Sequence, residues 1–339
     1  MKRYLGVDLH RNRFTVCTLT QDGKEETACW SIKDLSKFAK TLKETDEVAL
    51  EATGNTRLFT EALKDAGCRL VVVNPHDFLL ICRSVKKTDA HDARLLAEFL
   101  SKDMLPTVRT KDLLHAKVGS LVKTRDNLVK LRTALKNRVS NLLASKGVLL
   151  KKESLSSEKG LQGALKADLD AIEYLEMEVL VEQIRHLNES IAKLEGAIRD
   201  QGPKLPGWES ITSIKGIGPV GGTALLAVIG NVNDFADEGK LAAYFGIVPR
   251  VSDSNEVHKR GSITKRGSKL GRTVLIQCAL IASRYNGYLR AYYQRLAQRR
   301  GTGKAIVALA RKFLGIIYKT LKNGWIFEDF PKFILARAA

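Results

Sequence analysis

The sequence has few cysteines, and no two of them are spaced as a pair. Its five cysteines are an odd number scattered over 339 residues, without a C-x-x-C pair, so neither a disulfide framework nor a zinc site is indicated. No apolar run approaches the ~20 residues that a membrane-spanning helix needs. Asp8 interrupts the N-terminal segment before the apolar core of a signal peptide could form. These absences predict a soluble, cytoplasmic protein.

Acidic residues are missing from a long C-terminal stretch. Residues 257–327 contain sixteen lysines and arginines and no aspartate or glutamate, in a chain with a formal net charge of +19. Such a charge favours a polyanionic partner. Residues 46–56, by contrast, contain three acids and no base. An acidic pocket within a basic protein suits metal-dependent chemistry on phosphates, whereas a solubilising surface usually mixes both signs.

The first hundred residues alternate strand and helix patterns, which predicts an α/β domain. Three strands separated by turns come first, followed by strands that alternate with helices. This order is found in ribonuclease H-like (RuvC-like) folds, although other mixed sheets also fit it. The expected strands are 4–9, 14–19, 26–31, 47–51 and 70–73, and the expected helices are 35–43, 58–66 and 90–100.

The middle of the chain predicts a long helical coiled-coil connector. Apolar residues recur at heptad spacing within 114–150, interrupted by Arg125 and Arg132, and again without interruption from Met177 to Ile198. The second series favours oligomerisation, but an intramolecular hairpin of the two helices fits equally well. The two series are Leu114, Val118, Leu121, Leu128, Leu135, Val139 and Leu142, and Met177, Leu180, Ile184, Leu187, Ile191, Leu194 and Ile198.

Glycine and proline near 202–207 mark a linker, which divides the chain into an α/β domain (1–110), the connector (111–200) and a mostly α-helical C-terminal domain (201–339). The last part has one polar, glycine-rich interruption at 246–271. We expect a loop there without strong secondary structure. Loops of this length are uncommon in compact domains unless they are functional.

Four acids are placed where strands end or a helix begins. Asp8 and Glu51 each close an apolar strand, and Asp89 and Asp92 lie three residues apart at a helix start, on one face. Acids that converge repel one another unless a cation neutralises them. Two Mg²⁺ ions, with Mn²⁺ as a substitute, are the usual solution for phosphodiester chemistry. Taken singly, each acid also fits a loop-edge position or, for Asp89, a helix cap in competition with Thr88.

The sequence resembles the DEDD-type insertion-sequence transposases, relatives of the Piv invertase that are also known as the one-hundred-and-ten family or bridge-RNA recombinases. The resemblance covers essentially the whole chain. It implies a Holliday-junction-resolvase-like catalytic domain with Asp8, Glu51, Asp89 and Asp92 as the metal-binding tetrad. The matching segments are Gly6-Val7-Asp8, Leu50-Glu51-Ala52-Thr53-Gly54, Val73-Asn74-Pro75, Lys87-Thr88-Asp89-Ala90-His91-Asp92-Ala93-Arg94 and the C-terminal run around 249–254.

The segment from Ser213 to Pro219 resembles a helix-hairpin-helix turn. Gly216 and Gly218 would let backbone N–H groups approach a phosphate, with Lys215 beside them. A tight turn between packed helices is the alternative.

The polar interruption carries serines among basic residues. By resemblance, the family's C-terminal domain supplies a serine nucleophile shortly after a G-x-x-P-R segment, which here ends at Arg250. Ser254 is the matching position, and Ser252 is the alternative. The loop cations expected to contact nucleic acid are Arg250, Lys259, Arg260, Lys265 and Arg266.

Two further basic stretches suit nucleic acid. Residues 117–138 hold seven bases and one acid, and residues 284–304 interleave arginines with four tyrosines, a mixture that suits phosphate contact and stacking on RNA. A helix with an apolar core face and a solvated basic face is the alternative in both.

The favoured interpretation is therefore a DNA recombinase that acts on double-stranded DNA as a homo-oligomer, guided by a structured non-coding RNA, the guide being implied by the resemblance alone. Three other functions compete with it: a junction-resolving nuclease that uses water, a kinase-like ATPase with a phosphate loop at residues 6–8, and a non-catalytic DNA-binding protein.

Overall fold

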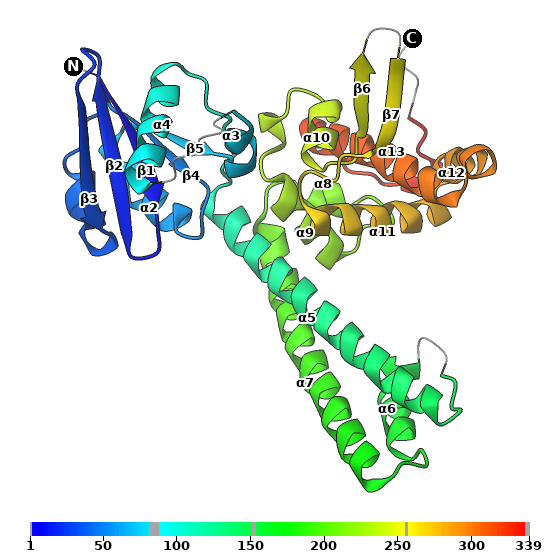
Figure 1. Ribbon diagram of the computed structural model, residues 1–339. Helices are drawn as coiled ribbons and strands as arrows, with labels where there is room; N and C mark the ends of the chain where they lie inside the picture. The colour runs from blue at the N-terminus through cyan, green and yellow to red at the C-terminus, as the bar shows by residue number, and fades with distance from the viewer. Residues whose placement is uncertain (1, 82–87, 151–153, 255–256, 336–339) are drawn as a thin grey trace. The chain divides into compact units, whose positions relative to one another are not determined.

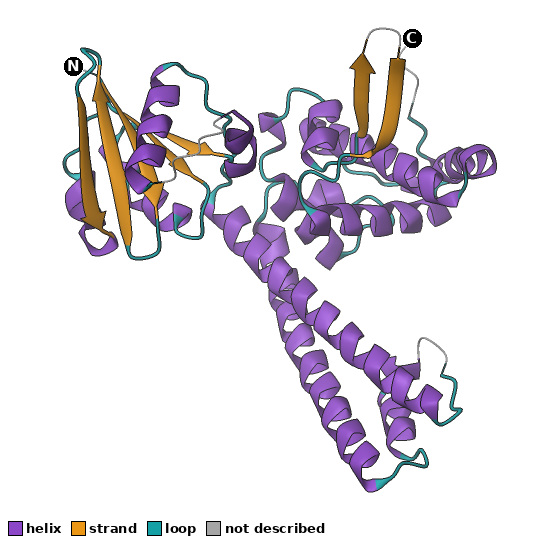
Figure 2. Ribbon diagram, viewed as in Figure 1, coloured by secondary structure: helices purple, strands orange, loops and turns teal. Residues whose placement is uncertain are grey.

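The computed structural model describes residues 2–81, 88–150, 154–254 and 257–335 and divides the chain into two compact units, Met1–Thr110 and Lys111–Ala339 (Figure 1). The first unit combines a sheet with helices, and the second is mostly helical with one small ribbon of strands (Figure 2). This confirms the α/β and mostly helical composition expected of the two ends of the chain. The three-part division stays a prediction. Among the described residues, the structure has no helix both long and apolar enough to cross a membrane.

The first unit is built on a five-stranded sheet of order β3-β2-β1-β4-β5. The first three strands pair antiparallel, and β4 and β5 extend the sheet in parallel from β1. All five strands fall within two residues of the expected ranges, because each apolar run ends at a turn or a polar residue. The strands are β1 (Arg3–Leu9), β2 (Arg13–Thr20), β3 (Glu25–Ser31), β4 (Glu47–Glu51) and β5 (Arg69–Val73).

Strand alternation sends side chains to two differently covered faces. One face packs Leu5, Val7 and Leu50 against the aromatic side chains of α1 and α2. The other packs Ala49 and Val71, among others, against α3 and α4. The covering helices are α1 (Leu35–Ala39), α2 (Thr56–Ala62), α3 (Pro75–Ile81) and α4 (Asp89–Ser101), with short 3-10 helices at Ile32–Asp34 and Lys64–Ala66.

Gly6 allows α4 to lie directly on the sheet. A Cβ atom at this position would come within 2.0 Å of the Ala93 carbonyl oxygen and 2.4 Å of the Ala97 backbone nitrogen. Real Cβ atoms do not approach other atoms so closely, so any side chain here would push the helix away from β1. The glycine therefore fixes the distance between β1 and α4, two elements that carry expected acids.

The second unit begins with an antiparallel helical hairpin. α5 (Leu113–Ser145) and α7 (Ala171–Gln201) pack along each other, and α6 (Glu158–Leu165) follows the short 3-10 helix Ser154–Ser156 near the far end (Figure 1). The apolar positions of α7 pack against α5 of the same chain. Arg125 and Arg132 contact Glu195 and Asn188 of α7, with N–O distances of 2.9 and 2.8 Å. The intramolecular hairpin is thus the interpretation that the structure shows, while oligomerisation stays a prediction.

The rest of the second unit is a helical bundle around one apolar core. A two-stranded antiparallel ribbon, β6 and β7, stands in place of the loop expected at 246–271, so that expectation was wrong. The ribbon carries few apolar side chains, and Val251 is 54% exposed, which explains the weak strand pattern. The elements are α8 (Trp208–Thr212), α9 (Pro219–Ile229), α10 (Glu238–Tyr244), β6 (Pro249–Ser254), β7 (Val257–Ile263), α11 (Lys269–Tyr285), α12 (Gly287–Arg300) and α13 (Thr302–Asn323), with 3-10 helices at Gly202–Lys204, Val232–Asp234 and Phe330–Lys332.

Candidate functional site

The carboxyl ends of β1 and β4 bring two of the expected acids to one edge. The strands are parallel neighbours, with Val7 opposite Leu50, so Asp8 and Glu51 follow at adjacent positions. Alternation places both on the face that Gly6 and Ala49 share, which is the face covered by α4. Asp8 and Glu51 therefore lie beneath the same helix.

The first turn of α4 adds the other two acids. Thr88 caps this helix: its side-chain oxygen accepts a hydrogen bond from the His91 backbone nitrogen at 3.2 Å. The capping alternative for Asp89 is therefore not what the structure shows. Asp89 and Asp92 both lie in the first turn, where helix N–H groups favour negative charge.

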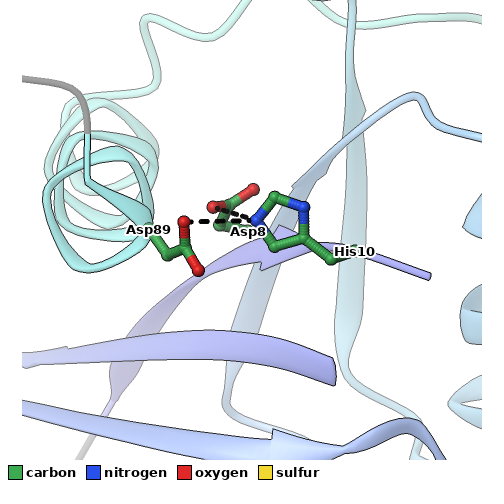
Figure 3. A group of neighbouring side chains, drawn as sticks. All are labelled: Asp8, His10 and Asp89. Atoms are coloured by element: carbon green, nitrogen blue, oxygen red, sulfur yellow. Dashed lines mark hydrogen bonds and ion pairs between the residues drawn. The ribbon is translucent and has the colours of Figure 1, made fainter. Parts of the chain in front are cut away.

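His10 joins Asp8 to Asp89. Its Nε2 atom lies 3.1 Å from Asp8 Oδ2 and 3.3 Å from Asp89 Oδ1 (Figure 3). Arg13 donates to the other carboxylate oxygen of Asp89 at 2.9 Å. The sequence interpretation treated residues 10–13 only as a turn and missed both side chains. The available signal was the basic character of this turn, which holds His10, Arg11 and Arg13 and follows the strand that carries Asp8.

The electrostatics of this edge differ between its acids. Burial raises the pKa of Asp8, and the negative charges of Asp89 and Asp92 raise it further against the opposing effect of His10. Desolvation acts on Asp89 in the same direction, but hydrogen bonds from His10 and Arg13 hold the pKa of its carboxyl below the ordinary value. Asp8 is thus a carboxylate whose ionised form would be stabilised by an added cation.

The donor set fits a divalent metal ion. Asp8, His10 and Asp89 each offer one ligand atom, and these atoms lie within 4.8 Å of one another. Carboxylate oxygens are the ligands that hard cations such as Mg²⁺ and Mn²⁺ prefer. Asp92 acts on Asp8 through its charge, and Glu51 is placed at the same edge by its strand. This edge of the sheet can therefore hold a cation, and the cation could neutralise the charge of a phosphate bound beside it.

The two other acids of residues 46–56 do not belong to this pocket. Asp46 and Glu47 lie at the amino end of β4, where Arg3 donates to Asp46 at 3.0 Å and Arg69 donates to Glu47 at 2.9 Å. Lys2 also pairs with Glu47. The expectation that this acidic stretch forms one pocket was wrong, because β4 separates its acids by the length of the strand.

In the second unit, the turn between α8 and α9 has a clear packing role. Gly216 adopts φ +112°, and a Cβ atom there would lie 2.6 Å from backbone atoms of Ala282 in α11. Gly218, the N-cap of α9, has open space around it. Lys215 is exposed and lies over the ring of Tyr285. Gly216 thus supports the alternative of a tight turn, whereas Gly218 and Lys215 remain accessible.

The ribbon carries the expected serines and several of the expected cations. Ser252 and Ser254 lie in β6, and Lys259 and Arg260 lie in β7; the side chains of 252–260, and Asn255 and Glu256 altogether, fall outside what the structure describes. Arg250 is exposed on β6, and Lys265 and Arg266 follow β7.

Most tyrosines of α11 and α12 do not form the exposed stacking surface that the sequence suggested. Tyr288, Tyr292 and Tyr293 pack against the core, and Lys312 lies 4.9 and 4.8 Å from the ring centres of the first two. Tyr285 is 50% exposed. The alternative of an apolar face directed to the core therefore describes three of the four tyrosines.

Two transposase family models match segments of the chain, and named relatives match most of its length. A model described as "Transposase IS116/IS110/IS902 family" matches residues 209–294, and the DEDD transposase model of IS110 elements, described as "Transposase", matches residues 5–147. The "Pilin gene-inverting protein" of Moraxella lacunata is 29% identical over 96% of this chain and 98% of its own. The "Transposase for insertion sequence element IS1111A" of Coxiella burnetii is 27% identical over 94% and 89%. A "Probable family 20 transposase" of Pseudomonas aeruginosa is 29% identical over 81% and 84%.

The DEDD model covers the α/β unit together with α5, and the other model covers the helical unit from α8 into α12. The chain carries the domains of the IS116/IS110/IS902 family of insertion-sequence transposases, which confirms the resemblance found in the sequence. Transposase domains imply that the substrate is DNA.

Proposed function

We propose that the carboxyl edge of the first unit, with Asp8, Glu51, Asp89 and Asp92, is the metal-binding catalytic site of this transposase. The observation that carries the proposal is the convergence of Asp8 and Asp89 on His10, in a setting that raises the pKa of Asp8. Bound Mg²⁺, in two ions, would neutralise developing charge on a phosphate. The order of the strands, three antiparallel and two parallel with α4 across them, supports a RuvC-like fold.

The second part of the proposal is a serine nucleophile, Ser254, on β6. Its Oγ atom attacks a phosphorus of the DNA backbone; a serine–phosphate bond forms as a P–O bond of the DNA breaks. The serine proton passes to a base in solvent, and the departing oxygen gains a proton. Support comes from the position of Ser254 after the Pro249-Arg250 segment and from the cations around it. Ser252, the alternative nucleophile, is two residues away on the same strand.

Detection of a covalent protein–DNA adduct tests the proposed role of Ser254. Wild-type protein mixed with Mg²⁺ and DNA carrying the element ends should yield a covalent protein–DNA species on denaturing gels, and mass spectrometry should find it at Ser254. Ser254→Ala should bind DNA and form no adduct, with Ser262→Ala as a control on the same ribbon. An adduct lost in Ser252→Ala but kept in Ser254→Ala would contradict the assignment.

We further propose a structured RNA and a second copy of the chain as partners, on the basis of the family resemblance and the net charge of +19. Co-purification of a discrete RNA and a molar mass above that of one chain by light scattering would be the supporting results.

A second candidate function is a junction-resolving nuclease that uses water, because the acidic edge alone contains what such an enzyme needs. DNA cleavage that persists in both serine variants without any adduct would favour it.

A further inference from the structure

A basic groove in the second unit is lined by none of the four acids of the proposed metal site and not by Ser254. It has a volume of about 590 Å³ and is walled by one face of α5, the middle of α9 and the N-terminus of α11, three helices that lie side by side in Figure 1. Four lysines line it, against a single acid, Asp126, which is itself paired with Lys130. The lysines are Lys111, Lys123, Lys130 and Lys269.

The end of the groove at α11 is suited to an anion. Ser268 caps this 17-residue helix by accepting a hydrogen bond from the Gly271 nitrogen at 3.0 Å, and Lys269 follows as its first residue. The first N–H groups of a helix have no partner within it and attract negative charge. Phosphate groups bind at such positions.

A buried histidine also lines the groove. His115 lines the groove and its side chain is only 3% exposed. Its Nδ1 atom contacts the Asp112 carboxylate, whereas its buried Nε2 atom has no hydrogen-bond partner among the described residues. A buried polar atom without a partner is costly.

The shape and chemistry of the groove select the ligand. The lining residues of α5 run from His115 to Lys130, a face of about 22 Å, which is the axial length of about six phosphates of one DNA strand. Among the described residues, no phenylalanine, tyrosine or tryptophan lines the groove, and the one imidazole ring, His115, is buried, so the groove lacks the exposed stacking surface that single strands use. Lysine, serine and asparagine side chains and a helix N-terminus are instead the donors that position a duplex by its backbone.

We propose that this groove binds the phosphate backbone of one strand of double-stranded DNA, independently of sequence. It would hold the duplex through Lys123 and Lys269, both exposed, while chemistry occurs elsewhere. The proposal depends on DNA being the substrate and not on the acidic tetrad or Ser254.

The test compares two double variants by fluorescence anisotropy with a labelled duplex in EDTA, so that metal binding plays no part. Lys123→Gln/Lys269→Gln removes two groove cations. Lys117→Gln/Lys193→Gln removes two exposed cations of α5 and α7 that do not line the groove. The groove variant should bind about tenfold more weakly at moderate salt, with a log–log salt slope shallower by about 2. The control should change its slope by much less, and thermal melting should show both variants folded.

A second measurement uses the unaltered protein. Acetylation of lysines followed by mass spectrometry should show Lys123 and Lys269 protected by duplex DNA, and Lys117 and Lys193 unprotected. Equal slopes for the two double variants, or no protection in the groove, would overturn the proposal. It would also be overturned if the groove variant lost affinity for structured RNA and kept it for duplex DNA.

Discussion

At the amino end of β4, Asp46 and Glu47 are almost fully buried, and each contacts a cation of a neighbouring strand. At the carboxyl end of the same sheet, Asp8 and Asp89 converge on His10, and Arg13 donates to Asp89. Glu51 ends the neighbouring strand, and Asp92 lies in the first turn of α4. The first set is neutralised by the protein itself, which suits a structural role. In the second set, burial and neighbouring negative charges raise the pKa of Asp8, so a cation from outside would stabilise its ionised form.

The largest difference between the two ends should appear in catalysis. Replacing any one of Asp8, Glu51, Asp89 or Asp92 by its amide should lower recombination by about 10³-fold, because each loss weakens the neutralisation of phosphate charge. Asp46→Asn should keep activity wherever the protein is folded. Recombination in cells with a reporter substrate measures this. Near wild-type activity in two of the four variants would contradict the tetrad.

At the amino end of β4, substitution should affect the stability of the fold and not catalysis. Asp46→Asn should lower the free energy of unfolding by about 3 kcal/mol at pH 7, since it leaves the Arg3 guanidinium without its buried partner. Urea unfolding provides the measurement. An unchanged denaturation midpoint would show that this pair is not structural.

The loss of stability in Asp46→Asn should depend on pH. Arg3 and the Lys43 backbone N–H hold the pKa of Asp46 below its ordinary value of 3.8 against the effect of burial. The stabilisation is then present above pH 3.8 and disappears as the pH falls through the lower, folded-state pKa. Wild type and Asp46→Asn should therefore converge in stability in strong acid and differ most near neutrality.

Packing between β1 and α4 should matter for both stability and the site. Gly6→Ala should destabilise the protein by about 1–3 kcal/mol, because its Cβ atom would meet the Ala93 carbonyl oxygen. It should also weaken metal binding by moving Asp89 away from Asp8. Gly54→Ala, where a Cβ atom meets nothing within 4 Å, is the control. Equal melting temperatures for the two variants would contradict the close approach.

The smallest expected effect is a gain in folding stability, in contrast to the losses predicted above. The pKa of Asp8 is raised in the folded protein. In metal-free buffer, Asp8 therefore favours the folded state while its carboxyl is protonated, and this contribution to stability is lost as the pH rises through the folded-state pKa. Asp8→Asn should therefore be more stable than wild type at pH 7 without metal. Thermal unfolding in EDTA tests this, and destabilisation instead would mean that Asp8 has a structural role.

The sequence predicted the parts of the fold that local patterns determine. Apolar runs closed by acids located β1 and β4, and a heptad series located α7. The ribbon was missed because its strands bury little and pair only with each other. His10 and Arg13 were missed because contact with Asp89 depends on how a turn meets a helix about eighty residues later in the chain, which no local pattern encodes.

Likewise, heptad spacing could not distinguish a partner helix in the same chain from one in another. The contacts of Arg125 and Arg132 with α7 show how the two apparent interruptions of the seam are accommodated. A polar residue in an apolar series is therefore informative only once its partner is known.

The most direct test of the metal site is a Mn²⁺ titration, followed by electron paramagnetic resonance, of wild type, Asp8→Asn and Asp46→Asn. The account predicts that Asp46→Asn binds Mn²⁺ as wild type does, whereas Asp8→Asn loses most of the binding. Wild-type affinity in Asp8→Asn, or equal losses in the two variants, would contradict the assignment of metal to the carboxyl end of the sheet.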